Sequence, residues 1–151
     1  MPRDIIASCV MEKGPSSGDR EERLEWAERA DWTPSPEQVE RGLTDPDATI
    51  RATWAQRTDF DPTPVQIERG LTDSEAKVRA AWASRSDYLS TPVQVERGLT
   101  DPDWIVRSKW AERMDYTPTP QQIDRGVADS ESIIRWAWAS RQDFTPTHAQ
   151  V

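Results

Sequence analysis

Residues 40–67 read ERGLTDPDATIRATWAQRTDFDPTPVQI, and the 28 residues that follow, 68–95, repeat almost the same string. The frame continues without a gap through 96–123 and 124–151, and a weaker copy occupies 12–39. Tryptophan followed by alanine returns in every copy, at positions 26, 54, 82, 110 and 138. Self-similarity at a fixed period of this length is the signature of a repeat array. We therefore expect a single repeat domain over 12–151, with residues 1–11 as a partial repeat or cap.

Each copy predicts two helices. In the copy 40–67, Asp45 can cap the first helix, which is expected to run to about Arg57. Ile50 and Trp54 are four residues apart and therefore face the core together. A repeat this small needs one large side chain to fill its share of the core. We therefore expect the repeated tryptophans to be buried rather than available for stacking on a base.

A second, short helix follows a break in the chain. The residue before a proline avoids the helical region, so the segment 61–64 (Asp-Pro-Thr-Pro) separates the two helices. Thr63 and Gln66 have the spacing of a capping box, and Gly70 is expected to end the helix in a left-handed conformation. No segment alternates polar and apolar residues with a period of two, so no strands are expected.

The pattern resembles HEAT-like repeats and the leucine-rich-repeat variant family. The similarity is carried by Asp-Pro-Asp at 45–47 and 101–103, followed by an aliphatic residue and arginine at 50–51 and 106–107. It implies an all-α fold, a right-handed superhelix (solenoid) of about five two-helix repeats. It also implies hydrogen-bonded ladders between neighbouring repeats, made by a repeated aspartate and a repeated arginine. The implied pairs are Asp45 with Arg51, Asp73 with Arg79, Asp101 with Arg107 and Asp129 with Arg135.

Charge and hydropathy exclude several classes of protein. The chain carries 19 basic and 27 acidic residues, a net charge of −8, which argues against a general binder of phosphate backbones. No apolar run is long enough to span a membrane, and no signal peptide is visible. We therefore expect a cytoplasmic protein that does not interact with a membrane.

Residues for catalysis are scarce. Cys9 and His148 are the only cysteine and histidine, and they stand at opposite ends of the sequence. They offer neither a nucleophile pair nor a multi-thiolate metal site. No phosphate-binding loop, HExxH or GxSxG motif is present. We expect no enzymatic activity, no cofactor and no metal.

Residues that break the repeat template are the candidates for function. Trp104 and Trp136 each replace an alanine or serine found at the corresponding position of three other copies. Exposed tryptophans are favoured anchors of protein interfaces. Both are therefore candidate partner-binding residues, with packing against a neighbouring repeat as the alternative.

Acidic residues break the template in the first copy. Residues 12–39 hold 8 acidic and 4 basic residues, which is half of the net charge of the chain. Four glutamates fall within two turns of one predicted helix: Glu21, Glu22, Glu25 and Glu28. They are interpreted either as a polar cap that keeps the end of the array soluble or as an anionic surface that imitates nucleic acid or docks on a basic partner.

The sequence thus predicts a non-catalytic solenoid that binds another macromolecule, and the expected partner is a protein. The alternative is an inhibitor of a host defence nuclease, because small acidic repeat proteins resemble phage- or prophage-encoded inhibitors, including anti-CRISPR proteins, in size and charge. Two further hypotheses remain. The repeated arginines could bind nucleic acid directly, although we expect them to be paired with acidic side chains of the repeat. The C-terminal repeat, which no polar capping repeat follows, could form a homodimer.

Overall fold

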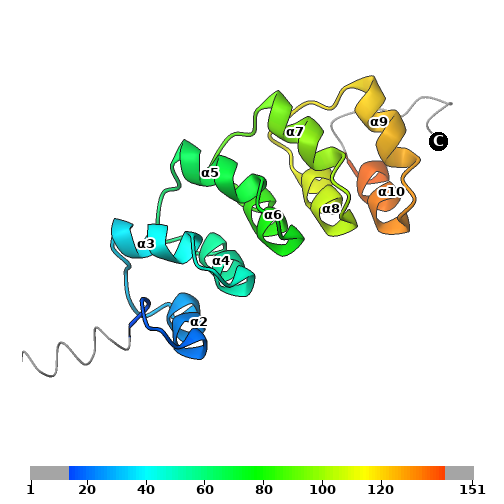
Figure 1. Ribbon diagram of the computed structural model, residues 1–151. Helices are drawn as coiled ribbons and strands as arrows, with labels where there is room; N and C mark the ends of the chain where they lie inside the picture. Colours follow the sequence, from blue (N-terminus) through cyan, green and yellow to red (C-terminus); the bar gives the residue numbers. More distant parts are fainter. Residues whose placement is uncertain (1–13, 142–151) are drawn as a thin grey trace, which may run out of the picture. The chain divides into compact units, whose positions relative to one another are not determined.

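A computed structural model of the chain describes residues 14–141, which form helices joined by short turns and loops (Figure 1). The described residues contain no strand, so the prediction of an all-α fold is confirmed for them. They divide into two compact units between Trp82 and Ala83. Cys9, His148 and the expected partial repeat at 1–11 lie outside the described residues.

The helices are of two kinds. Those that we call the proline helices begin with proline: α3 (Pro36–Leu43), α5 (Pro64–Leu71), α7 (Pro92–Leu99) and α9 (Pro120–Val127). Those that we call the tryptophan helices carry the repeated tryptophan: α2 (Arg20–Glu28), α4 (Ala48–Ala55), α6 (Ala76–Ala83), α8 (Trp104–Glu112) and α10 (Ser132–Ala139). Both kinds are eight or nine residues long.

Successive helix pairs pack on one another within each unit. In the first unit, α4 contacts both α2 and α3, and α3 contacts α5. In the second unit, α7 contacts α8 and α9, and α10 contacts α8 and α9. A serial arrangement of this kind is what a repeat array requires, because one pair of short helices cannot bury its apolar face alone.

The prediction that Asp45 caps α4 is wrong. The N-cap is Asp47, whose carboxylate accepts the backbone N–H groups of Thr49 and Ile50 at 2.8 and 3.1 Å. Asp45 instead accepts the N–H of Asp47 at 2.9 Å, which turns the chain before the helix starts. The helix ends at Ala55, two residues earlier than expected.

The predicted start of the proline helices is confirmed. The hydroxyl of Thr63 accepts the N–H of Gln66 at 3.2 Å, and the Gln66 side chain accepts the N–H of Thr63 at 3.0 Å. The same capping box begins each of the other proline helices, at Ser35, Thr91 and Thr119.

The core follows the predicted Ile/Trp spacing. Ile50 and Trp54 are each 1% exposed, and Trp82, Trp110 and Trp138 are each 2% exposed. Trp26 in the first copy is only half-buried. The tryptophans are therefore core residues in the later copies, and base stacking by them is excluded there.

The repeated glycine has a different role from the expected one. Gly70 lies inside α5, and no described glycine has a positive φ, so the prediction of a left-handed helix end is wrong. A Cβ at Gly70 would overlap the indole of Trp82. The same contact joins Gly42 to Trp54, Gly98 to Trp110 and Gly126 to Trp138. Glycine is needed because the indole packs directly on the backbone of the proline helix.

This contact predicts a large effect of Gly98→Ala. The added methyl group has to displace Trp110 from a packed core, and overpacking of this kind costs about 1–3 kcal/mol of unfolding free energy. Gly18→Ala is the matched control, since nothing lies within 4 Å of a Cβ there. Urea unfolding followed by tryptophan fluorescence measures both, and an equal effect of the two substitutions would contradict the packing argument.

Candidate functional site

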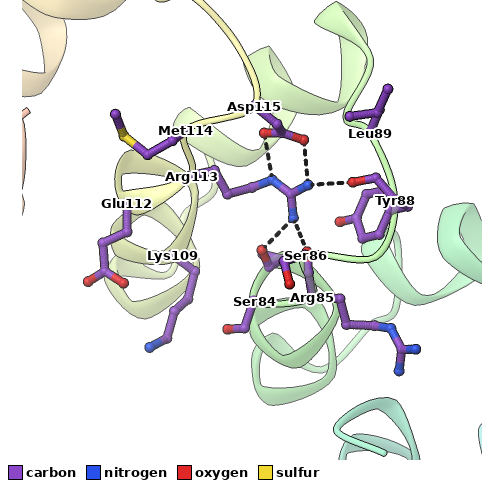
Figure 2. A pocket seen from close by; sticks show the side chains of 11 residues that line it. Ser84, Arg85, Ser86, Tyr88, Leu89, Lys109, Glu112, Arg113, Met114 and Asp115 are labelled. Carbon is purple, nitrogen blue, oxygen red and sulfur yellow. Dashed lines mark hydrogen bonds and ion pairs between the residues drawn. The ribbon is translucent and has the colours of Figure 1, made fainter. Parts of the chain in front are cut away.

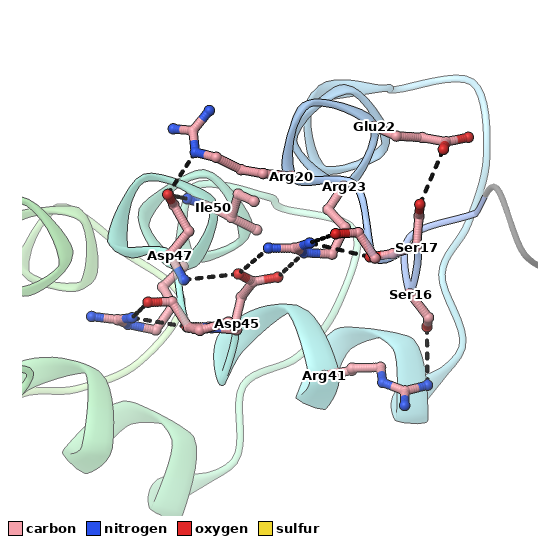
Figure 3. A network of polar contacts seen from close by, with 12 residues as sticks. Ser16, Ser17, Arg20, Glu22, Arg23, Arg41, Asp45, Asp47 and Ile50 are labelled. Carbon is pink, nitrogen blue, oxygen red and sulfur yellow. Dashed lines mark hydrogen bonds and ion pairs between the residues drawn. The ribbon is translucent and has the colours of Figure 1, made fainter.

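An arginine ladder joins neighbouring repeats, but its pairs are displaced by one repeat from those expected. Nε and Nη2 of Arg51 donate to the carboxylate of Asp73, at 2.9 and 3.0 Å. The carboxylate of Asp45 is not its partner; Nη1 of Arg51 donates to the Asp45 carbonyl oxygen at 2.8 Å. Arg51 therefore binds the acid of the following repeat and the turn of its own repeat. Arg23 binds Asp45 in this way (Figure 3), and Arg107 binds Asp129.

A second arginine joins neighbouring repeats just after the tryptophan helices α4, α8 and α10. Nη1 of Arg113 donates to the carbonyl oxygens of Ala83 and Arg85 at 2.8 and 2.6 Å, which satisfies groups left unpaired at the end of α6. Nε and Nη2 hold both carboxylate oxygens of Asp115. The guanidinium lies 4.5 Å from the ring centre of Tyr88, a favourable cation–π distance. Arg57 and Arg141 bind the carbonyl groups of the preceding repeat in the same way.

These contacts occupy the arginines that a phosphate-binding stripe would need. The side chains of Arg57, Arg85 and Arg113 are only 6–8% exposed, and each holds the aspartate two residues further along. These contacts agree with the prediction that the repeated arginines are paired with acidic side chains. The repeated guanidinium groups thus serve the scaffold, and a binding site has to be sought among the residues that vary.

A pocket of about 510 Å³ lies beside Arg113, between residues 83–89 and 109–115 (Figure 2). Its apolar wall includes Leu89 and Met114, which are 84% and 61% exposed. Lys109 and Glu112 add one charge of each sign. The pocket offers apolar contact area beside these two charges.

The same hollow recurs one repeat further along with a different lining. It has a volume of about 330 Å³ there and is lined by Met114 and Trp136 among others. In the first unit, the equivalent hollow of about 470 Å³ is lined by polar residues such as Thr53, Gln56 and Thr58. The repeat therefore keeps the hollow and changes its chemistry.

The changing residues share one face of the tryptophan helices, spaced four and then three residues apart, which we call the outer face. Its first position holds Glu21, Thr49, Lys77, Ile105 and Ile133. Its second holds Glu25, Thr53, Ala81, Lys109 and Ala137, and its third Glu28, Gln56, Ser84, Glu112 and Ser140. Nζ of Lys77 donates to Oγ1 of Thr49 at 2.9 Å, so these two equivalent positions of α4 and α6 lie side by side.

Both candidate tryptophans are exposed, Trp104 by 42% and Trp136 by 70%. Trp136 lines the smaller hollow with Met114, whereas Trp104, the first residue of α8, lines none of the hollows described above. The structure therefore does not place both in one pocket. The equivalent of Trp136 in α8 is Ser108, which is 6% exposed.

The candidate glutamates separate into two sets. Glu21, Glu25 and Glu28 are exposed on the outer face of α2. Glu22 takes the inward position that Ile50 has in the next copy, is half-buried, and accepts the hydroxyl of Ser17 at 3.1 Å. Three of the four predicted residues are therefore exposed, and the fourth is held by a contact within its own repeat.

Leu89 and Met114 were missed by the sequence-based selection. Leu89 stands where other copies have threonine or aspartate, and Met114 where they have alanine, threonine, serine or glutamine. The comparison of copies that selected Trp104 and Trp136 would have found them. The neighbouring Ser90 replaces a proline, and its N–H donates to Asp115 Oδ2 at 2.8 Å, a bond that proline cannot make.

Comparison with known proteins finds no match among family models, curated proteins or solved structures. The similarity to HEAT-like repeats therefore rests on the pattern of residues. Within residues 14–141, no helix is long and apolar enough to cross a membrane. No group of three or more potential ligands for a metal ion is found in the same part of the chain.

The environment of Arg113 predicts the effect of its replacement. Arg113→Lys loses the fork that binds two carbonyl groups and a carboxylate together, and several buried groups lose partners, which costs about 2–4 kcal/mol of unfolding free energy. Arg29→Lys is the matched control, because Arg29 occupies the same template position and is 43% exposed. Its described contacts are the exposed Asp31 and the ring of Trp26 in its own repeat. Chemical unfolding compares them, and a loss as small as that of Arg29→Lys would refute the bridging role.

Titration of Asp115 offers a second test. Burial raises the pKa of Asp115, but hydrogen bonds from Arg113 and the Ser90 N–H outweigh it and lower the pKa from 3.8 to about 2. Because the folded-state pKa is depressed, the stabilisation is present above pH 4 and is lost as the pH falls towards 2. It amounts to about 2 kcal/mol. Asp115→Asn should lose this much at pH 7 and progressively less below pH 4, whereas the exposed Asp61→Asn serves as control. A loss that does not change with pH would contradict the assignment.

Proposed function

We propose that this protein is a right-handed α-solenoid of about five two-helix repeats that binds another protein, without catalysis, through apolar side chains exposed on the tryptophan helices of its second unit and on the loops that follow them. The glycine–tryptophan contacts and the arginine ladders use the same residues in copy after copy. Outer-face residues differ between copies and take no part in these contacts. A repeat scaffold with a fixed core and a variable surface is suited to recognition of a macromolecule.

One observation carries the proposal: large apolar side chains are exposed along the tryptophan helices of the second unit and the loops that follow them. They are Leu89, Trp104, Ile105, Met114, Ile133 and Trp136. In the described part of the first unit, the one exposed large apolar residue is Val65, which lies on a proline helix, as does its exposed equivalent Val93 in the second unit. Exposed apolar side chains flanked by charges such as Lys109 and Glu112 are typical of protein interfaces.

The two hollows suggest how a partner would be held. Met114 lines both of them, with Leu89 on one side and Trp136 on the other. A partner could therefore insert one apolar side chain into each hollow, with Met114 between the two. Methionine adapts to irregular apolar surfaces, which suits a contact point shared by two pockets.

The test is affinity capture from a lysate of the source cells, with the full chain as bait. We expect a protein that is retained by the wild type and lost from Met114→Ser and Trp136→Ser, since removal of an interface anchor costs about 2 kcal/mol or more. Val65→Thr is the matched control, because Val65 is 71% exposed but lies on a proline helix of the other unit. The same set of captured proteins from wild type and both variants would refute the proposal.

Inhibition of a defence nuclease through a surface that imitates nucleic acid is the second candidate. It is favoured by the three exposed carboxylates on the outer face of α2, Glu21, Glu25 and Glu28. Of these, Glu21 is paired with Arg20 at 2.6 Å. In the same experiment, loss of a captured nuclease from the triple Glu→Gln variant, with retention by Met114→Ser, would select this candidate.

A further inference from the structure

Residues that break the repeat template gather around the hollow beside Arg113. Leu89, Lys109 and Met114 all line it, and none of the three residue types occurs at the same position of another copy. Lys109 and Met114 lie on one side of the Arg113 guanidinium and Leu89 on the other (Figure 2). In the equivalent hollow of the first unit, threonines stand in place of Lys109 and Met114. Two adjacent copies of the repeat thus contribute to a change in the chemistry of one hollow.

The exposure of Leu89 and Met114 is a property of their positions in the repeat. The residues equivalent to Leu89 are exposed in every described copy, and so are those equivalent to Met114. Apolar side chains at these two positions are therefore held in solvent by the fold itself, and are 84% and 61% exposed. A segment of another protein that covered them would remove apolar surface from water, which favours binding.

Two charges at the hollow have no ion-pair partner among the described residues. Arg85 and Arg113 each hold the aspartate two residues further along, at 2.6 Å. Lys109 and Glu112, by contrast, form no ion pair within residues 14–141, either with each other or with another residue. The hollow therefore presents one cation and one anion that a bound segment could use.

Lys109 is the charge that selects the occupant. It is half-buried, whereas Glu112 is exposed, and solvent screens an exposed charge more effectively. An apolar segment that enters the hollow would cover the ammonium group of Lys109 further. Burying a charge is costly unless the charge is paired. The occupant therefore has to bring an anion to Lys109 together with its apolar side chain.

The hollow also restricts the form of the occupant. Its volume of about 510 Å³ lies within the roughly 300–1,000 Å³ of ligand sites. It is open to solvent rather than enclosed, so a chain can cross it and continue on both sides. A nucleic-acid strand is unsuitable, because its phosphates would face a protein of net charge −8 with a single unpaired cation at this place. A carboxylate on a protein segment meets both requirements.

We propose that this hollow binds a segment in the interior of the partner chain, in which an apolar side chain is followed by an aspartate or glutamate. The apolar side chain would lie between Leu89 and Met114, and the carboxylate would pair with Lys109. This inference rests on the proposed function, because it specifies the chemistry of a protein partner at the same unit.

The probe is a blocked phenylalanine–glutamate dipeptide, with phenylalanine–glutamine and phenylalanine–lysine dipeptides for comparison. Each is titrated into the isotope-labelled full-length protein, and the methyl signals of Leu89 and Met114 are followed by NMR. We expect weak, saturable shifts of both signals, since a dipeptide supplies little contact area. The glutamate dipeptide should bind about fivefold more tightly than the glutamine one, the difference expected for a partly exposed ion pair. The lysine dipeptide should bind most weakly.

Variants of the protein assign the preference to its residues. Lys109→Gln should make the glutamate and glutamine dipeptides equivalent. Lys77→Gln is the matched control, because Lys77 is an exposed lysine of the other unit and should leave the preference unchanged. Met114→Ser should weaken both dipeptides by the same factor, since it removes apolar contact area and no charge.

Several results would overturn the inference. Equal affinity of the glutamate and glutamine dipeptides for the wild type would remove the role of Lys109. Tighter binding of the lysine dipeptide, abolished by Glu112→Gln, would show that the hollow selects a cation. Tighter binding of acetylphenylalanine, whose carboxylate is a chain end, would replace the interior segment by a C-terminus. A concentration-dependent dimer abolished by Lys109→Gln would make a second copy of this chain the occupant.

Capture experiments keep this inference separate from the proposed function. If Met114→Ser and Trp136→Ser lose the partner but the dipeptides show no preference for the carboxylate, this inference fails and the proposed function stands. If the dipeptides behave as expected but both variants capture every protein that the wild type captures, the proposed function fails. The carboxylate selectivity of the hollow then stands as a property of the site alone.

Discussion

The structure depends on one constraint: each repeat is too small to satisfy its own backbone and bury its own tryptophan, so an arginine of the next repeat completes it. Arg113 shows the arrangement, because its guanidinium closes the end of α6, covers Tyr88 and holds Asp115. Charge is tolerated in this semi-buried place because every donor has an acceptor. The high content of charged residues is therefore part of the internal structure rather than a sign of disorder.

Because some repeat positions hold the array together and others do not, binding residues can occur only at the latter. The ladder arginines, the capping boxes and the glycine–tryptophan contacts all engage groups inside the repeat array, and their substitution would disturb folding before it disturbed recognition. Residues on the outer face of the tryptophan helices take no part in these contacts. It is acidic on α2, polar on α4 and largely apolar on α10. The same scaffold can thus present surfaces of different chemistry to different partners.

The prediction from sequence was best where a residue acts on its immediate neighbours. The capping box of Thr63 and the inward spacing of Ile50 and Trp54 are local and were confirmed. It failed where two chemically equal choices compete. Asp45 and Asp47 can both cap a helix. Asp47 is the cap in the structure because the carboxylate of Asp45 is bound by Arg23 of the preceding repeat. Leu89 and Met114 were detectable as template breaks, but their exposure depends on packing.

The sequence by itself determined the period, the all-helical class and the identity of the core tryptophans, because all of these follow from spacing along one chain. Only the tertiary structure decided which aspartate each ladder arginine holds and why the repeated glycine is required, since both depend on contacts between helices. It also decided that Glu22 is half-buried and bound to Ser17, and that Trp136 is exposed where Ser108 is buried. A side chain's solvent exposure is set by the helix that packs over it, and equivalent positions in a repeat can differ in that respect alone.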